Sequence, residues 1–376
     1  MLAEQGGPVE LKTLVQDRGL CTACGACAGL CPYIYAVKEK VAVIYPCGAA
    51  EGSCYRVCPR TPTDPGELDR QVFGTPRADH VLGENSGIYF SRAQDPAIAG
   101  RAQYGGTVTA LLTFLRRQGR VDAALAARGN GAAPPEPAVA VTPEDLLACA
   151  GSRYSACPTL AALPQAVGQE GFRRLAVAGR PCQVTALRKM QGLAQEQQFS
   201  RLPAAKLEHL VIIGLFCFWA LTPDFYPFLA KKAGPEEIRK VDIPVGGLKI
   251  TFAGGKELLV PVDEVRPLIR PACLECFDPT AELADVSVGS TEFDPAWNTL
   301  VVRTAAGKAL VEEARAAGVI ALKPYPEERL PILRRAALNK KMRVLNTGTG
   351  DGNGYLRLSG EYREQLLRQR QGGENG

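Results

Sequence analysis

The feature that most constrains this chain is a run of four cysteines near its start, Cys21-x2-Cys24-x2-Cys27-x3-Cys31-Pro32. Three thiolates at this spacing hold one cubane iron–sulfur cluster, and a fourth before proline reaches a second cluster in proteins with two such runs. A zinc knuckle would use only two of these thiols, so zinc is the poorer explanation. The run predicts a 4Fe–4S cluster in a small N-terminal region that needs metal to fold.

A second, less regular cysteine run follows, Cys47-x6-Cys54-x3-Cys58-Pro59. Counting back from Cys58, the thiols missing from a regular run would fall on Gly48 and Glu51. The ligand exchange of two-cluster ferredoxins predicts one cluster on Cys21, Cys24, Cys27 and Cys58, and a second on Cys31, Cys47 and Cys54. The ligand at the fourth corner of the second cluster stays open. Glu51 or a distant cysteine could bind there, or the corner could have no ligand, as in a 3Fe–4S cluster.

Two more cysteines follow stretches that are typical of buried strands. Cys182 comes after Arg174–Gly179 and begins a predicted helix, where the helix dipole favours a thiolate. Cys217 comes after the second apolar stretch, His209–Leu215. If the two strands are neighbours, both thiols lie at one edge of the sheet.

A close pair, Cys273 and Cys276, would complete a third cluster there. Spacing alone leaves open the alternative of one buried cysteine and a zinc pair. The remaining cysteines, Cys149 and Cys157, are expected to be buried as small apolar residues.

Composition narrows the class of protein. Thirteen cysteines without a basic, apolar leader predict a cytoplasmic protein whose thiols serve metal or redox chemistry. Only two histidines are present, which argues against Ser-His-Asp catalysis and His-rich zinc sites. No apolar run reaches the ~18 residues of a membrane span.

The whole net charge of +5 resides in the last part of the chain, where Lys323 to Gly376 hold eleven Lys or Arg against six acids. Two interpretations are open: a solvated terminal helix, or a surface for an acidic partner or an anionic cofactor. The closest group of cations is Arg334, Arg335, Lys340, Lys341 and Arg343. No nucleic-acid motif accompanies it, so we expect no nucleic-acid partner. The segment Gly348–Gly354 resembles a phosphate loop but lacks the Lys-Ser/Thr ending.

Strand and helix patterns alternate from residue 172 onward and predict an α/β (α+β) region with a mixed sheet. Besides the two strands above, the patterns predict a helix at 106–118, a helix start at Thr142-Pro143, a hairpin at 248–262, a strand at 297–304 and a helix at 307–316.

Several of these motifs resemble the coenzyme F420 hydrogenase/dehydrogenase beta-subunit family, which is related to 7-hydroxymethyl chlorophyll a reductase and formate dehydrogenase beta subunits. The resembling stretches, in the family's order, are 21–32, 104–112, 151–154, 179–183, 273–278 and 284–289. Two departures stand out: the irregular second cysteine run, and Phe218, where the family more usually has a small residue after Cys217.

The resemblance implies FAD and a 4Fe–4S cluster beside it, held by Cys182, Cys217, Cys273 and Cys276. It implies a ferredoxin-like iron–sulfur domain at 1–75, followed by a flavin domain whose N-terminal part is 76–170 and whose C-terminal part is 171–376. Because no Gly-x-Gly-x-x-Gly follows a strand, FAD would be held without a Rossmann turn. The residues expected at FAD are Tyr104, Gly105, Gly106, Thr107, Ser152, Arg153, Tyr154, Gly179, Arg180 and Pro181.

Physical chemistry supports parts of that set. Gly105 and Gly106 open a predicted helix, whose free amides suit a pyrophosphate, although a plain helix start explains them too. Ser152, Arg153 and Tyr154 supply a hydroxyl, a cation and an aromatic ring.

The sequence thus predicts an iron–sulfur flavoprotein oxidoreductase subunit that moves electrons between 4Fe–4S clusters and FAD. From FAD the electrons would pass to a two-electron carrier such as coenzyme F420, or to a partner dehydrogenase or hydrogenase. Expected partners are ferredoxin or a subunit of hydrogenase, formate dehydrogenase or heterodisulfide reductase type. The alternatives are a stand-alone, ferredoxin-dependent FAD reductase of a small organic substrate, or a non-catalytic electron-transfer subunit.

Overall fold

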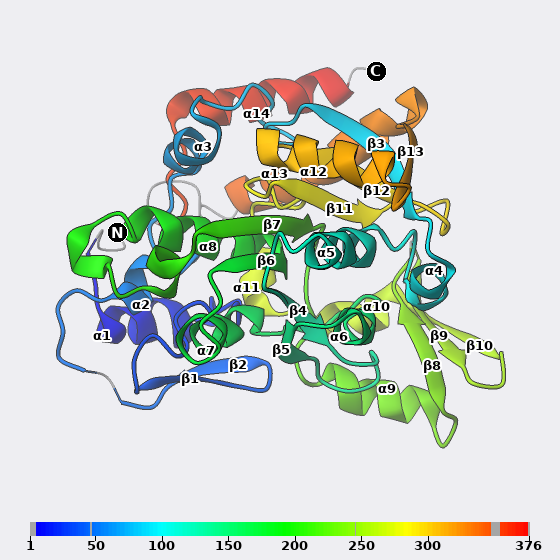
Figure 1. Ribbon diagram of the computed structural model, residues 1–376, viewed down its shortest axis with the longest axis horizontal. Helices are drawn as coiled ribbons and strands as arrows, with labels where there is room; N and C mark the ends of the chain where they lie inside the picture. Colours follow the sequence, from blue (N-terminus) through cyan, green and yellow to red (C-terminus); the bar gives the residue numbers. More distant parts are fainter. Residues whose placement is uncertain (1–4, 46, 245, 347–353, 375–376) are drawn as a thin grey trace.

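An eight-stranded mixed sheet forms the centre of the computed structural model, which describes residues 5–45, 47–244, 246–346 and 354–374 (Figure 1). The strand order is β13-β3-β12-β11-β7-β6-β4-β5. The four inner strands β11, β7, β6 and β4 are parallel, and antiparallel strands extend both edges. The bounds are β3 Gly87–Ala93, β4 Ala123–Arg128, β5 Glu136–Ala140, β6 Arg174–Gly179, β7 His209–Leu215, β11 Val286–Ser290, β12 Asn298–Val302 and β13 Ile320–Pro324.

Successive residues of the inner strands enter two different cores, because side chains alternate across a strand. Leu125, Val177 and Ile212 face one core, which also contains α8 (Pro181–Leu193) and α7 (Leu163–Gly168). Their neighbours Ala126, Ala178 and Ile213 face the other. The second core is closed by α5 (Thr107–Arg117), α6 (Pro143–Ala148) and α12 (Ala305–Ala316). The sheet is therefore covered on both faces, as buried parallel strands require.

The N-terminal residues form a small unit that we call the head. It contains α1 (Pro8–Glu10), the hairpin of β1 (Ile34–Val37) and β2 (Lys40–Val43), and α2 (Ser53–Arg56). Leu11, Ile34 and Tyr55 of the head lie in the same core as Val184 and Leu187 of α8. The head thus has more apolar packing than its sequence indicated, since it borrows part of its core from the larger region. Between the head and β3 lies α3 (Pro65–Phe73).

A second, three-stranded sheet stands beside the large one (Figure 1). Its strands β8 (Ile238–Asp242), β9 (Gly247–Phe252) and β10 (Glu257–Pro261) share a core with α9 (Phe225–Ala233). The other helices are α4 (Pro96–Arg101), α10 (Val262–Val265), α11 (Pro271–Leu274), α13 (Leu330–Asn346) and α14 (Gly360–Glu374).

The predicted mixed α/β fold is confirmed, and most predicted elements lie within a few residues of their expected bounds. Strands β6 and β7 occupy the predicted ranges, and the hairpin at 248–262 is β9 and β10. Helix α8 begins at Pro181, two residues earlier than expected, because proline suits the first helical position. Apart from Gly354, the segment resembling a phosphate loop lies outside the described residues. Among the described residues, no helix combines the length and apolar character of a bilayer span.

Candidate functional site

The carboxyl ends of β6 and β7 bring two predicted cluster ligands to one edge of the sheet. The strands are parallel neighbours, with Gly179 opposite Gly214, so Cys182 and Cys217 both leave the sheet at this edge. The pair at Cys273 and Cys276 approaches from α11, where the backbone amide of Ala220 donates to Cys273 Sγ at 3.3 Å. The structure therefore brings all four residues of the predicted third cluster to the same region.

Electrostatics among these thiols supports the same grouping. Burial raises the pKa of Cys217 to about 12, Lys340 and Arg180 oppose that rise, and Cys273 and Cys276 add to it. For Cys276, Lys340 and Arg60 outweigh burial and lower the thiol pKa. Neighbouring cations favour thiolates, the form in which cysteine binds metal.

The head thiols form two further groups. Burial raises the pKa of Cys27, and the nearby thiols of Cys24, Cys58, Cys21 and Cys54 raise it further. Burial also raises the pKa of Cys54 to about 11, with Cys31 and Cys47 contributing. The leading neighbours in each case match the predicted ligand sets. The ligand roles themselves stay predictions.

No three His, Cys, Asp or Glu side chains of the described residues converge closely enough for a single metal ion. A cubane cluster instead spreads its thiolates over different irons. The open corner of the second cluster remains unassigned, and Glu51 lies 2.5 Å from Arg56 in an ion pair. Of the two leftover cysteines, Cys157 is buried as expected, whereas Cys149 is only half-buried.

Helix α8 joins the head to the sheet edge. Gln183, next to Cys182, donates from Nε2 to the carbonyls of Cys24 at 3.4 Å and Cys157 at 2.9 Å. Two turns later, Lys189 donates from Nζ to the carbonyl of Cys58 at 2.7 Å. One rigid helix therefore fixes the first thiol group of the head against the thiols at the sheet edge.

The predicted FAD residues lie in three segments, and the first contains the start of α5. Gly106 has a φ of 78°, which glycine adopts without strain. Gly105 has no room for a side chain, because a Cβ there would lie 2.7 Å from the carbonyl oxygen of Ser91. The amide of Thr107 is not free as expected, because it donates to Asn298 Oδ1 at 3.1 Å, and the Thr107 hydroxyl bonds Ser91. Thr107 thus holds the loop in place, and the later amides of the first turn are left for an anion.

The second segment, Ser152 to Tyr154, faces the small sheet. Tyr154 donates to Asp242 Oδ1 at 2.6 Å, and burial followed by Asp242 raises the pKa of Tyr104. The two predicted tyrosines therefore share one carboxylate of β8, a residue that sequence reasoning missed. Arg153 is held by the carbonyls of Ser152, Ala150 and Gly129, while its buried Nε has no hydrogen-bond partner among the residues that the structure describes.

The third segment, Gly179 to Pro181, lies between the end of β6 and Cys182. Arg180 donates from Nη2 to the carbonyl of Cys157 at 3.1 Å, and Cys182, Cys217 and Cys273 support its positive charge. A cavity of about 50 Å³ is lined by Pro181, Cys182 and Cys276. A larger one of about 800 Å³ lies between the β1–β2 hairpin and β5, away from the predicted FAD residues.

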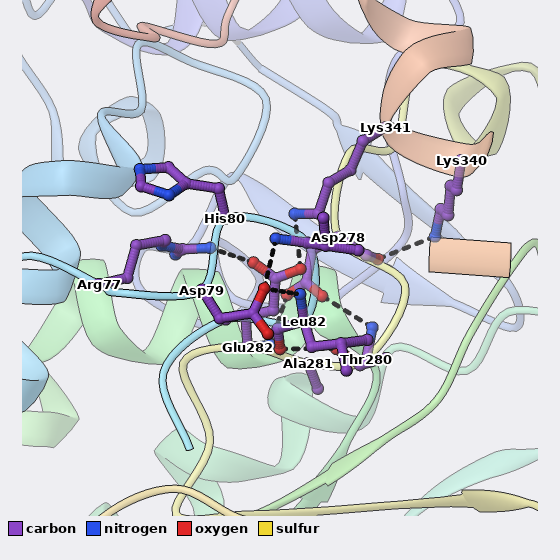
Figure 2. Close-up of polar contacts among 12 residues, drawn as sticks. Arg77, Asp79, His80, Leu82, Asp278, Thr280, Ala281, Glu282, Lys340 and Lys341 are labelled. Atoms are coloured by element: carbon purple, nitrogen blue, oxygen red, sulfur yellow. Dashed lines mark hydrogen bonds and ion pairs between the residues drawn. The ribbon is translucent and has the colours of Figure 1, made fainter. Parts of the chain in front are cut away.

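Part of the C-terminal group of cations faces inward and is not available as a surface for a partner. Lys340 and Lys341 are buried and reach inward from α13 toward the Asp278–Glu282 segment (Figure 2). Lys340 Nζ donates to the carbonyls of Cys217 at 2.5 Å and Asp278 at 2.8 Å. Arg343 donates to the carbonyls of Cys273 and Leu274. These three cations stabilise the loops that carry the predicted third cluster, whereas Arg335 of the same group is exposed.

Behind these loops lies a buried ionic network that the sequence did not predict. Glu282 pairs with Arg77 and, at 2.6 Å, with the fully buried Lys341 (Figure 2). Arg77 also binds both carboxylate oxygens of Asp69, and Arg334 pairs with Asp79. Ionic groups this deep are stable only when paired, so the network fixes α13 against the Cys276 loop.

Comparison with known proteins places this mixed-sheet, cysteine-rich chain among redox subunits. Models of the coenzyme F420 hydrogenase/dehydrogenase beta subunit match residues 88–164 with their N-terminal part and residues 172–328 with their C-terminal part. The chain belongs to this family. Both matches begin after the head, so the head lies outside the residues that the family models match.

Individual relatives support the same family assignment. The beta subunit of coenzyme F420 hydrogenase from Methanothermobacter thermautotrophicus is 32% identical over 69% of this chain and 93% of its own length. The corresponding beta subunit from Methanosarcina barkeri is 30% identical over 70% and 90%. Coenzyme F420-dependent sulfite reductase of Methanocaldococcus jannaschii is 32% identical, but this chain spans only 46% of it.

The fold also matches a solved structure. A chain of the F420-reducing NiFe hydrogenase complex from Methanosarcina barkeri superimposes with a TM-score of 0.66 at 28% identity. The match covers 72% of this chain and 93% of that one. The large mixed sheet is therefore the family's fold.

Proposed function

We propose that this protein is an iron–sulfur flavoprotein subunit that passes electrons between 4Fe–4S clusters and FAD. Coenzyme F420 or a hydrogenase-type partner subunit would be the next carrier. The observation that carries the proposal is that the thiol group of the head lies next to the thiol group at the sheet edge in space. Gln183, the residue after Cys182, donates to the carbonyl of Cys24 at 3.4 Å, so the first thiol group of the head lies beside the thiols at the sheet edge. That adjacency supports a path for electrons between the two predicted clusters.

The donor chemistry of the residues fits these groups. Cys21, Cys24, Cys27 and Cys58 would hold the first cluster, and Cys182, Cys217, Cys273 and Cys276 the third. Cys31, Cys47 and Cys54 would hold the second. Iron–sulfur clusters bind to thiolates, and cations such as Arg180 and Lys340 favour that charged form here.

The three FAD segments offer the groups that a flavin dinucleotide needs. The first turn of α5 has backbone amides for an anion. Arg153 contributes a guanidinium with one unpartnered donor, and Tyr104 and Tyr154 add rings beside Asp242. When bound, FAD supplies the exchange between one-electron and two-electron transfer. The chain's own part is to hold the flavin near Arg180 and Cys182 and to keep that edge buried.

Turnover by the isolated chain tests this function. Reduced coenzyme F420 and a viologen acceptor are mixed anaerobically with purified protein, and the F420 and viologen absorbances are recorded. Catalytic electron flow supports a flavin-dependent oxidoreductase subunit. Iron-loaded protein with no flavin and no turnover would instead favour the non-catalytic electron-transfer subunit.

A further inference from the structure

The outer face of the β1–β2 hairpin is apolar and exposed. Cross-strand pairing places Tyr35 opposite Ala42 and Val37 opposite Lys40. The amide of Ile44 donates to the carbonyl of Tyr33 at 2.8 Å, which extends the same face. The patch, which we call the hairpin patch, consists of Tyr33, Tyr35, Val37, Ile44 and Tyr45, with exposed fractions of 39%, 47%, 58%, 63% and 61%. A contiguous apolar patch of this kind typically marks an interaction site.

The hairpin patch is next to the more accessible of the two thiol groups in the head. Cys31 lies two residues before Tyr33, and Cys47 lies two residues after Tyr45. Both thiols are half-buried and only Cys54 of their group is buried, whereas in the first group only Cys21 is half-buried and the other three thiols are buried. The second thiol group is therefore the point at which electrons would enter or leave the head.

The tip of the hairpin adds positive charge. Lys38 and Lys40 are exposed and form no ion pair with any carboxylate of the described residues, while Glu39 between them is 2% exposed. Lys38 also has a φ of 51°, a conformation that glycine or asparagine adopts more easily.

We propose that the hairpin patch is the docking surface for an acidic, ferredoxin-like one-electron carrier. An aromatic centre with a cationic rim has the composition of a transient protein interface, and complementary charge raises the rate of encounter. In each encounter the carrier's cluster is oxidised by one electron as the second cluster of the head gains one. Two encounters deliver the electron pair that FAD takes up with protons from solvent. The inference rests on the proposed function and places its protein partner on the head.

Stopped-flow reduction tests the surface. A reduced, acidic two-cluster bacterial ferredoxin is mixed anaerobically with the full chain, and bleaching of the chain's clusters is followed. The double variant Ile44→Ser/Tyr45→Ser should slow the second-order reaction by roughly tenfold, since central interface side chains dominate affinity. Lys38→Glu/Lys40→Glu should slow it similarly at low salt, with the difference shrinking at high salt.

Matched controls separate docking from other effects. Leu259→Ser removes an apolar side chain that is 61% exposed on β10, and Lys231→Glu reverses an exposed charge on α9. Both should leave the ferredoxin rate unchanged. Dithionite needs no docking surface, so it should reduce all variants as fast as the wild type. Equal ferredoxin rates in wild type and patch variants, or a wild type that ferredoxin does not reduce although dithionite does, would overturn the docking proposal. Failure of dithionite to reduce any cluster would instead overturn the proposed function.

Discussion

Lys340 on α13 places its ammonium nitrogen 2.5 Å from the carbonyl oxygen of Cys217, which follows β7. The same nitrogen contacts the carbonyl of Asp278, beside Cys276. A single buried cation therefore ties α13 to both sides of the predicted third cluster. This helix supports the predicted site although it contributes no predicted ligand.

Replacing this cation should change the reduction potential of the third cluster. Adding an electron is easier beside a positive charge, so Lys340→Met should shift the midpoint negative by roughly 50 mV or more. EPR-monitored redox titration measures the shift. Lys340→Arg keeps the charge and should stay close to wild type. An unchanged potential in the methionine variant would mean that Lys340 serves packing alone.

Lys189 should control the stability of the first cluster. Its ammonium contacts the carbonyls of Cys58 and Pro62 and the hydroxyls of Thr61 and Thr63, at 2.7 to 3.2 Å. Lys189→Met leaves these acceptors unpaired, which costs about 1–3 kcal/mol. Iron loss to a chelator should be faster in this variant, and cluster-specific EPR should show the first cluster leaving before the third. Equal rates of iron loss would exclude this role.

The ion pair between Lys341 and Glu282 should be a large contributor to stability. Lys341→Met leaves a buried carboxylate with one cation fewer and should destabilise the fold by about 3–5 kcal/mol. Denaturant unfolding of the two proteins gives the difference. Lys308→Met removes the exposed pair with Glu312 and should change stability by less than about 0.5 kcal/mol. Similar losses in both variants would contradict the burial argument.

Acidification should destabilise the fold in part through His80. Burial, followed by Arg77, lowers the pKa of His80 below its usual 6.5, so the folded state binds a proton at this side chain less readily. The unfolded chain binds the proton more readily, and stability is therefore lost as the pH falls through that usual value. His80→Gln should show a smaller loss between pH 8 and pH 6 in urea unfolding. Identical pH slopes for variant and wild type would refute the assignment.

Part of this architecture could be predicted from local sequence. Arg174–Gly179 and His209–Leu215 are short apolar runs with turn residues beyond them, and both are strands of the parallel centre. Their adjacency makes the convergence of Cys182 with Cys217 a consequence of strand direction. Cysteine spacing predicts ligand sets in the head, because metal ligation restricts spacing more than packing does, and those sets stay predictions.

Other parts depend on contacts that no local pattern contains. Lys340 and Lys341 count as surface charge in the sequence, yet their partners Cys217 and Glu282 lie about 120 and 60 residues away. A lysine is buried only when such partners exist, so charge counting placed these two lysines on the surface when they lie inside. Asp242, which joins Tyr104 and Tyr154, was missed because the small sheet carries no motif of its own.

The most direct measurement is a joint count of iron, sulfide and flavin in the anaerobically purified chain. Eleven thiols arranged as three groups predict roughly 11–12 irons per chain by ferredoxin ligation, together with one released FAD. Cys273→Ser should lose about one cluster and disturb the flavin, whereas Cys149→Ser should keep the wild-type count. Four or fewer irons per chain, or fully iron-loaded protein that releases FMN or no flavin, would contradict an iron–sulfur flavoprotein of this design.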